Sequence, residues 1–424
     1  MNILIFSASF NHTYMGGHIS SMLTIGNELV QNKLNVLICL PETLGKNNGA
    51  NEIGEIFPLN KIIWVPKSKY LLNIINFKNY LYDVIKNNNI DIIHSFDLHG
   101  HIIARFCIRK FDYKLKALSN VCGGMIKYKY PYTFPIIVFT EELKDLIQGM
   151  YKIHPPEVIL EKARMRPSFY LSGLHEEKLT LDLKKKISNK KVILMVTRMS
   201  IIKIKAIMLA LKSVEKLANK RVDFIFILIG RVNTKAVYNF VKKKVDLINK
   251  KNKRQVILFD NNLSHITRNI FPLSDIVIGV AKVCFEGMLY KKPVVVLGTN
   301  GCSGLVNIED NEKFEKMVYN NFSSRDVTKK FNETEKIILN LEILLNDRAT
   351  RHKLGKKNFN WLRNNLNIRS GIDTYISAYR NLNRNTHQKI LPLRFAYYGI
   401  LIIFLGTISG FMREFYLRLK LWRL

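Results

Sequence analysis

The sequence predicts an α/β fold in which two parallel β-sheets follow one another along the chain. Short apolar runs alternate with longer amphipathic segments, which is the pattern of buried parallel strands separated by helices. This alternation is interrupted around Pro155, Pro156 and Pro167 and then starts again, which indicates two domains. A chain of 424 residues with 47% hydrophobic residues is long and apolar enough for two such cores.

The strands and helices can be assigned in chain order. In the first half we expect strands at 3–7, 35–40, 90–94 and 136–139, with helices at 17–31, 71–86 and 141–150. In the second half we expect strands at 192–196, 224–229, 256–259, 276–279 and 293–297. The predicted domains are 1–168 and 169–385, with the last helix able to return to the first domain, and a tail follows at 386–424.

The two ends of the chain differ in character. The apolar run at 1–6 has no basic stretch before it and no cleavage-site pattern, so we interpret it as a buried strand rather than a signal peptide. Near the other end, eighteen uncharged residues at 395–412 lie between Arg394 and Arg413 and precede a basic, aromatic segment. We expect this tail to lie in, dip into or anchor to the cytoplasmic face of the plasma membrane, and the alternative is a buried helix that packs on the domains.

Composition indicates the kind of partner. Lys and Arg number 66 against 33 Asp and Glu, and a formal net charge of +33 fits ligand phosphates, anionic lipid or nucleic acid. The lysine-rich runs at 184–186, 242–244 and 250–254 contain few aromatic residues, so we favour solvated helix faces over a nucleic-acid surface. The five cysteines are scattered without a CxxC pair, which predicts neither a disulfide framework nor a cysteine zinc site and fits a reducing cytoplasm.

Residues that follow predicted strands are the main candidates for ligand binding, because parallel α/β sheets bind ligands at the carboxyl ends of their strands. Gly16 and Gly17 precede a helix that opens with His18. Glycines let the backbone approach a ligand, and the start of a helix favours an anion. The alternative is a simple turn, which also needs glycine. Arg198 and Lys203 lie at a strand end and a helix start. Two cations so placed can hold a diphosphate, and the alternative is a solvated pair.

A third motif contains Gly279, Lys282 and Glu286, between a predicted strand and the glycine-rich loop at 298–304. A carboxylate on a helix after such a strand can accept hydrogen bonds from the two hydroxyls of a ribose. An ordinary surface glutamate is the alternative.

Together these motifs resemble family 4 glycosyltransferases of the GT-B fold in order and spacing. The resemblance is carried by Gly16-Gly17, the strand at 91–94, Arg198 with Lys203, and the Phe285-Glu286-Gly287-Met288 helix before Lys292-Pro293-Val294-Val295, and it extends over roughly residues 1–380. It implies two Rossmann-like domains facing across a cleft. The domain at 1–168 would lie on the acceptor side, and the domain at 169–385 would bind a nucleotide-sugar.

The resemblance also implies roles for individual residues. Arg198 and Lys203 match the pair that holds the donor diphosphate, Glu286 matches the glutamate that binds the ribose, and Gly16 with Gly17 matches the glycine loop near the donor phosphates. Transfer with retention of configuration, without a metal or other cofactor, is implied as well.

Three departures from the family pattern occur, one of which, Gly287 with the stretch at 289–292, affects packing more than chemistry. The family often has a second glutamate eight residues before the ribose-binding one, where this chain has Ile278, so we expect Lys282, Gly279 and nearby backbone to contact the donor. A histidine that commonly precedes glycines at a strand end is replaced by Cys122, before Gly123. Cys122, Gly123 and His18 are therefore the acceptor-side candidates.

The sequence thus predicts a hexosyltransferase that moves a sugar from a nucleotide-sugar to a glycan or lipid-linked acceptor in the assembly of cell-surface polysaccharide or glycolipid. The expected partners are the nucleotide-sugar, the acceptor and an anionic membrane surface, and no nucleic acid. The alternative is a non-catalytic GT-B-fold binding or scaffold protein at the membrane, which the isoleucine at position 278 favours.

Overall fold

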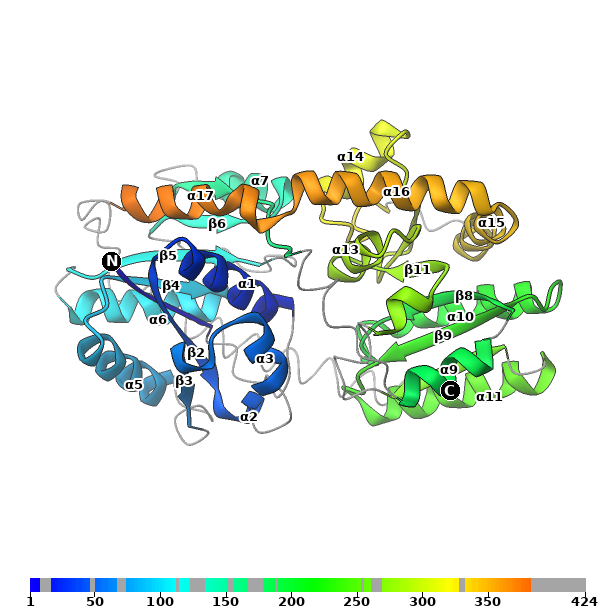
Figure 1. Cartoon of the computed structure of the whole chain (residues 1–424), viewed down its shortest axis with the longest axis horizontal. Coiled ribbons are helices and arrows are strands. Elements are labelled where there is room, and N and C mark those ends of the chain that lie inside the picture. The colour runs from blue at the N-terminus through cyan, green and yellow to red at the C-terminus, as the bar shows by residue number, and fades with distance from the viewer. Residues whose placement is uncertain are drawn as a thin grey trace. The chain divides into compact units, whose positions relative to one another are not determined.

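The computed structural model describes residues 1–7, 17–45, 50–66, 74–111, 114–122, 134–150, 156–166, 178–187, 189–252, 255–260, 269–327 and 332–382. The chain divides into two compact units (Figure 1). Unit 1 comprises Met1–Phe169 and the segment that begins at Asn365, and unit 2 comprises Tyr170–Asn364. The predicted tail at 386–424 lies outside the described residues. Within the described part of the chain, every helix is too short or too polar to cross a bilayer.

Unit 1 is built on a seven-stranded sheet in the order β3-β2-β1-β4-β5-β6-β7, in which all paired strands are parallel. The strands are β1 (Asn2–Ser7), β2 (Asn35–Pro41), β3 (Ile62–Val65), β4 (Ile92–Phe96), β5 (Lys116–Val121), β6 (Ile136–Val138) and β7 (Val158–Leu160). The helices are α1 (Gly17–Gln31), α2 (Glu42–Leu44), α3 (Ala50–Ile56), η2 (Leu59–Lys61), α5 (Ile74–Asn87), α6 (Asp97–Lys110), α7 (Glu141–Met150) and α17 (Ile368–Asn381). The strand order reverses direction between β1 and β4, which makes that position a topological switch point.

Both faces of this sheet are covered, which explains why its strands are almost continuously apolar. Successive side chains of β1 alternate between the faces. Ile3 and Ile5 pack in one core with α1, α3 and α17. Leu4 and Phe6 pack in a second core with α5 and α6.

The helix α17 completes unit 1 although it comes from the far end of the described chain. Its residues Ile372, Tyr375 and Tyr379 are buried in the same core as α1. A hydrogen bond of 2.7 Å joins the Tyr379 hydroxyl to His94 Nδ1. The predicted second domain runs to residue 385 with its last helix able to return to the first domain, and the structure places α17 in unit 1, where its apolar face is buried.

Two buried histidines of unit 1 are expected to make it acid-sensitive. Burial lowers the pKa of His94 to about 3 and the pKa of His101 well below its usual value, to which the Arg105 charge adds. In the unfolded chain a histidine takes up a proton near pH 6.5, whereas the buried His94 does so only near pH 3. Between these pH values the free energy of unfolding should therefore fall as the pH drops, by about 1.4 kcal/mol per pH unit for each histidine. Urea unfolding of the wild type and of His94→Gln, followed at several pH values between neutral and mildly acidic, measures this slope. The variant should show a shallower slope, and a wild type equally stable at about pH 7 and about pH 5 would contradict the prediction.

Unit 2 is built on a six-stranded sheet in the order β10-β9-β8-β11-β12-β13. The strands are β8 (Lys191–Val196), β9 (Phe224–Gly230), β10 (Val256–Asp260), β11 (Ile276–Gly279), β12 (Val294–Leu297) and β13 (Cys302–Leu305). The helices are α9 (Lys178–Ile187), α10 (Ile204–Ala218), α11 (Lys235–Lys251), η3 (Phe271–Leu273), α13 (Lys282–Leu289), α14 (Asn311–Tyr319), α15 (Glu333–Asn346) and α16 (Arg348–Asn365). All pairs are parallel except β12 with β13, which is antiparallel.

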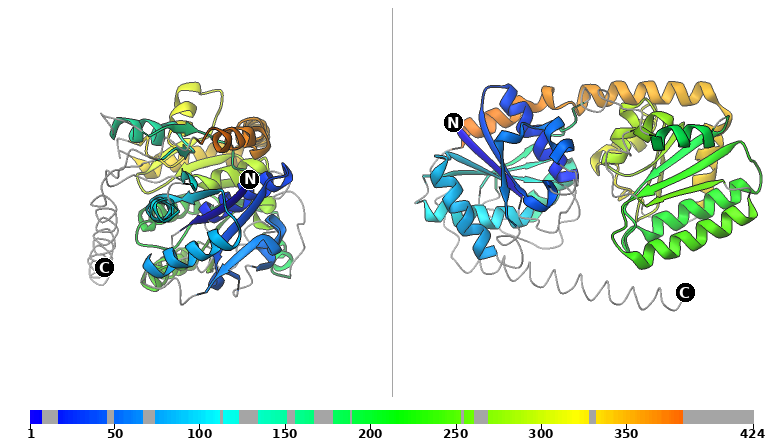
Figure 2. Two further views of the ribbon diagram at one scale, coloured as in Figure 1. Left: turned by 90° about the vertical axis from the view of Figure 1, so that its left-hand side faces the viewer. Right: turned by 60° about the horizontal axis from the view of Figure 1, so that its bottom comes forward.

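The core of unit 2 forms where α10, α11 and α15 pack on one face of this sheet. The helices α10 and α11 lie side by side there (Figure 2). The strand order reverses between β8 and β11, so unit 2 has its own switch point. Both units thus have the Rossmann-like arrangement of parallel strands and covering helices, which confirms the predicted α/β fold class.

Candidate functional site

The strongest candidate site lies at the switch point of unit 2, where the adjacent strands β8 and β11 end. After β8 the chain passes through Arg198 to Lys203, the N-cap residue of α10. The Arg198 side chain is exposed, and Lys203 is half-buried. The structure therefore brings the two predicted cations to the edge of the sheet where α/β proteins bind ligands.

Arg325 is a third cation whose charge acts at this site. Burial lowers the pKa of Lys203, and the positive charges of Arg198 and Arg325 lower it further. A neighbouring cation lowers a lysine pKa only when it lies close enough to disfavour the charged form. The sequence prediction did not include Arg325, because it lies in the irregular segment after α14 and belongs to no recognisable motif.

The path of the backbone to Arg198 depends on Gly230, the last residue of β9. A Cβ atom at Gly230 would lie 1.5 Å from the carbonyl oxygen of Thr197. On either side of Arg198, the Thr197 N–H donates to the Ile229 carbonyl at 3.0 Å and the Met199 N–H donates to the Arg231 carbonyl at 2.7 Å. Continued pairing with the β9 strand thus fixes the backbone of Arg198, and only glycine fits at position 230.

The connection between β11 and α13 is a tight turn of two residues, Val280 and Ala281. The Val283 N–H donates to the Val280 carbonyl at 3.2 Å, and the Ala281 N–H donates to the Phe322 carbonyl at 3.0 Å. Ala281 has φ 50° and ψ −118°, a backbone conformation that residues with a side chain rarely adopt. Strain of this kind is often found beside functional sites.

Ala281→Gly is expected to stabilise unit 2 by about 1 kcal/mol, because glycine adopts this conformation without a steric penalty. Urea unfolding followed by circular dichroism measures the change. The matched control is Ala236→Gly on the exposed face of α11, which should instead destabilise by about 0.5–1 kcal/mol. Equal destabilisation by both substitutions would show that the backbone at Ala281 is not strained.

The helix α13 carries two of the predicted donor-binding residues. Lys282 Nζ and Glu286 Oε1 form an ion pair of 3.5 Å one helical turn apart, and the Glu286 side chain is 15% exposed. An ionised carboxylate with part of its surface exposed can accept hydrogen bonds from ligand hydroxyls. Packing explains the glycine at position 279. A Cβ there would lie 2.4 Å from Cγ1 of Val283, so glycine lets α13 begin close to β11.

Ile278, where the family pattern would place a second glutamate, lies inside β11. Its side chain is fully buried in the core, and its strand neighbours are Met195 and Val295. Counting eight residues back from Glu286 reaches the strand because only two residues separate β11 from α13. A carboxylate at 278 would be buried among apolar side chains, at a high cost in free energy.

The predicted acceptor-side residues belong to unit 1. Gly17 is the exposed first residue of α1, with no atom within 4 Å of its Cβ position, and His18 follows it half-buried. Cys122 is half-buried directly after β5. These three residues therefore follow the carboxyl ends of strands, whereas Gly16 and Gly123 lie outside the described residues.

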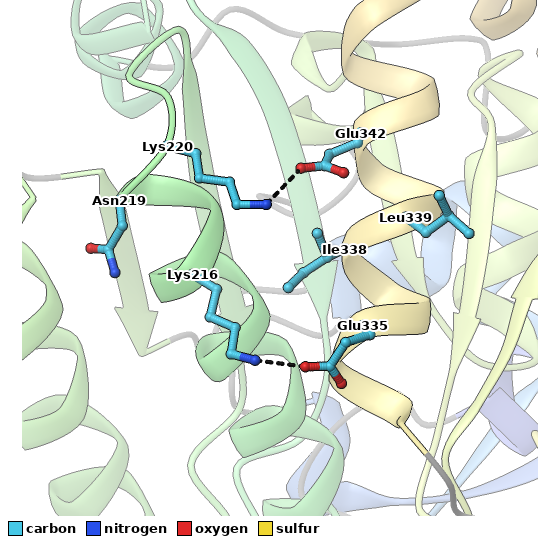
Figure 3. Close-up of a pocket in the computed structure, with 7 residues that line it drawn as sticks. All are labelled: Lys216, Asn219, Lys220, Glu335, Ile338, Leu339 and Glu342. Atoms are coloured by element: carbon cyan, nitrogen blue, oxygen red, sulfur yellow. Dashed lines mark hydrogen bonds and ion pairs between the residues drawn. The ribbon is translucent and has the colours of Figure 1, made fainter.

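A separate pocket of about 490 Å³ lies between α10 and α15 and contains none of the predicted residues (Figure 3). Two ion pairs cross it, Lys216 with Glu335 at 2.6 Å and Lys220 with Glu342 at 3.6 Å. Because its four charged side chains are paired with one another, this pocket is a weaker ligand site than the cation cluster.

Comparison with known proteins identifies the fold. No protein-family model and no curated protein sequence matches this chain. A glycosyltransferase from Rickettsia africae ESF-5 is 16% identical with a TM-score of 0.63, over 91% of this chain and 99% of that chain. HepE from Anabaena in complex with UDP is 12% identical with a TM-score of 0.62, over 90% and 100%. A UDP-GlcNAc 2-epimerase from Neisseria meningitidis bound to UDP-GlcNAc is 15% identical with a TM-score of 0.57, over 90% and 100%.

These similarities establish the GT-B fold, with two Rossmann-like domains. Because a glycosyltransferase and an epimerase both have this fold, the fold alone does not define the reaction. The reaction of this chain depends on the residues of its site.

Proposed function

We propose that this protein is a glycosyltransferase that uses a nucleotide-sugar donor, of the retaining family 4 type. One observation carries the proposal: Arg198 and Lys203 lie together at the switch point of unit 2, and α13, which carries Glu286, begins at the same sheet edge. Solved structures of the same fold include a glycosyltransferase and HepE with bound UDP, which supports a nucleotide-sugar as the ligand.

In this proposal the cations act on the leaving group. As the bond between the sugar and the diphosphate breaks, negative charge grows on the diphosphate. Arg198 and Lys203 hold the diphosphate and stabilise that charge, while the Glu286 carboxylate accepts hydrogen bonds from the ribose hydroxyls. Since cationic side chains supply the stabilisation, we propose a reaction without a metal or other cofactor.

We propose a glycan or lipid-linked acceptor and a position at the cytoplasmic face of a membrane, as in the assembly of surface polysaccharide or glycolipid. The charge of +33 and the exposed lysines of α11 support attraction to anionic lipid. These lysines are Lys235, Lys242, Lys243, Lys250 and Lys251. Flotation with vesicles containing phosphatidylglycerol tests this part, and equal recovery with vesicles of phosphatidylcholine alone would count against it.

A non-catalytic binding protein of the same fold is the second candidate. It is favoured by Ile278, which leaves the usual position of a donor-sugar contact inside the core. Such a protein would bind a nucleotide without turning over any sugar conjugate.

Thermal unfolding with UDP, GDP, ADP and their sugar conjugates tests the proposed function. We expect one nucleotide to raise the unfolding temperature of the wild type, by an amount that grows with ligand concentration. Arg198→Ala and Glu286→Ala should lose the shift, whereas Arg363→Ala, an exposed arginine of α16, should keep it. Absence of a shift with every nucleotide would refute the donor site. Binding without release of sugar or nucleotide from any conjugate would favour the second candidate.

A further inference from the structure

Arg325 lies in a segment, 320–327, that is held in a defined shape by its own hydrogen bonds. Asn320 Oδ1 accepts from the Ser323 N–H at 2.9 Å, and Arg325 Nη2 donates to the Asn320 carbonyl at 3.1 Å. Asp326 Oδ1 accepts from Asn320 Nδ2 and from the hydroxyl of Ser303 in β13, both at 2.8 Å. The segment is therefore fastened to itself and to the sheet.

The same segment is attached to the start of α13. The Phe322 carbonyl accepts the Ala281 N–H at 3.0 Å. The Phe322 ring lies among three aromatic side chains, with centroid distances of 5.6 Å to Phe285, 6.0 Å to Phe314 and 6.0 Å to Trp361. Phe322 keeps a positive φ of 53°, so packing and hydrogen bonding outweigh local backbone preference here.

A second set of contacts connects the segment to Lys203. The carbonyl oxygen of Ser323 lies 3.0 Å from the Cβ position of Gly298, so the two backbones approach closely there. The next residue, Thr299, donates its hydroxyl to the Ile202 carbonyl at 3.2 Å, one residue before Lys203. The segments that carry Lys203, Lys282 and Arg325 are thus mutually supported around one sheet edge.

We propose that Arg325 is a third phosphate-binding residue of this site, which holds the donor diphosphate together with Arg198 and Lys203. The proposal rests on the proposed function and names one further residue for it. Positive charges carried by segments that meet at one sheet edge repel one another, and an anion bound among them removes that repulsion. The planar guanidinium of Arg325 matches the geometry of phosphate oxygens, and its pinned segment limits the entropy lost on binding.

Calorimetric titration of the full-length protein with UDP, GDP, ADP and inorganic pyrophosphate tests the assignment. Arg325→Gln is expected to weaken binding of the preferred nucleoside diphosphate and of pyrophosphate by about 10- to 100-fold, the effect of losing a hydrogen bond between charged groups. Arg325→Lys should recover part of the loss because it restores the charge. Binding of the free nucleoside should be unchanged, since it carries no phosphate.

A purely structural arginine would give a different pattern. Arg325→Gln would then lower the unfolding temperature of the unliganded protein and leave its diphosphate affinity like that of the control Arg363→Gln, and this result would overturn the assignment. Failure of the wild type to bind any nucleoside diphosphate would refute the proposed function itself. Wild-type binding that is unaffected by Arg325→Gln would remove only the role of Arg325.

Discussion

Arg198→Gln and Lys203→Gln are each expected to lower the turnover of sugar transfer by about 10²- to 10³-fold, the effect of removing one group that stabilises developing charge. Arg198 follows β8 and Lys203 is the N-cap residue of α10, and in the proposed reaction both would act on the same leaving diphosphate. The measurement is kcat and kcat/KM for the donor identified by thermal unfolding. Because the diphosphate carries more negative charge in the transition state than in the bound donor, kcat should fall more than KM rises.

Two further features distinguish this role from simple donor binding. The double variant should lose less activity than the product of the two single losses, because both cations stabilise one charge.

The pKa of Lys203 is lowered by burial and by the charges of Arg198 and Arg325. Activity should therefore decline at a lower alkaline pH than it would with a lysine of ordinary pKa. Lys203→Arg keeps its charge and should move that decline to higher pH. A change in KM alone, with kcat preserved in both single variants, would contradict the mechanism.

Gly230→Ala is expected to destabilise unit 2 by more than about 4 kcal/mol, which is exceptional for one added methyl group. The added Cβ would lie 1.5 Å from the Thr197 carbonyl oxygen and 2.7 Å from its carbonyl carbon. A flexible side chain can move aside, but these are backbone atoms held by pairing of β8 with β9. Relief therefore requires displacement of the strand end that carries Arg198, and donor affinity should fall together with stability.

The control for this substitution is Gly149→Ala near the end of α7. Nothing lies within 4 Å of the Cβ position of Gly149, so alanine there should be neutral or stabilising by up to about 1 kcal/mol. Calorimetric unfolding temperatures and nucleotide titrations of both variants provide the comparison. If the two substitutions had similar effects, the contact of Gly230 with Thr197 would not constrain the site.

Hydrophobic patterning predicts most of this fold, because buried parallel strands have continuous apolar runs. The helices Gly17–Gln31 and Glu141–Met150 and the strand Ile276–Gly279 have the predicted bounds. The strands β3, β5, β7 and β13 were not predicted. In β5, Ser119 and Asn120 reduce the apolar signal, yet both are fully buried because they hydrogen-bond to buried histidines and serines of unit 1. Pairing of this kind joins residues that lie far apart in the sequence.

The site was only partly predictable for a similar reason. Arg198 and Lys203 are close in sequence and follow a clear strand, so their grouping follows from the chain itself. The proposed role of Arg325 depends on tertiary contacts of the irregular segment 320–327 with α13, which the sequence pattern does not reveal. The burial of Ile278 inside β11 could not be predicted from its spacing to Glu286. It follows from the turn after β11, which has only two residues.

The position of α17 in unit 1 affects the order in which the two units can fold during synthesis. The described part of unit 2 is continuous in sequence, so its described elements are available once the ribosome has translated through α16. Unit 1 begins at Met1 but lacks α17 until residue 381 has emerged, and until then the apolar surface of α1 that packs against Ile372 and Tyr375 stays uncovered. Domains generally fold from the N-terminus as they are made. Here unit 2, which is synthesised later, can complete its folding before unit 1. Until α17 is made, unit 1 is incomplete and accessible to chaperones and proteases.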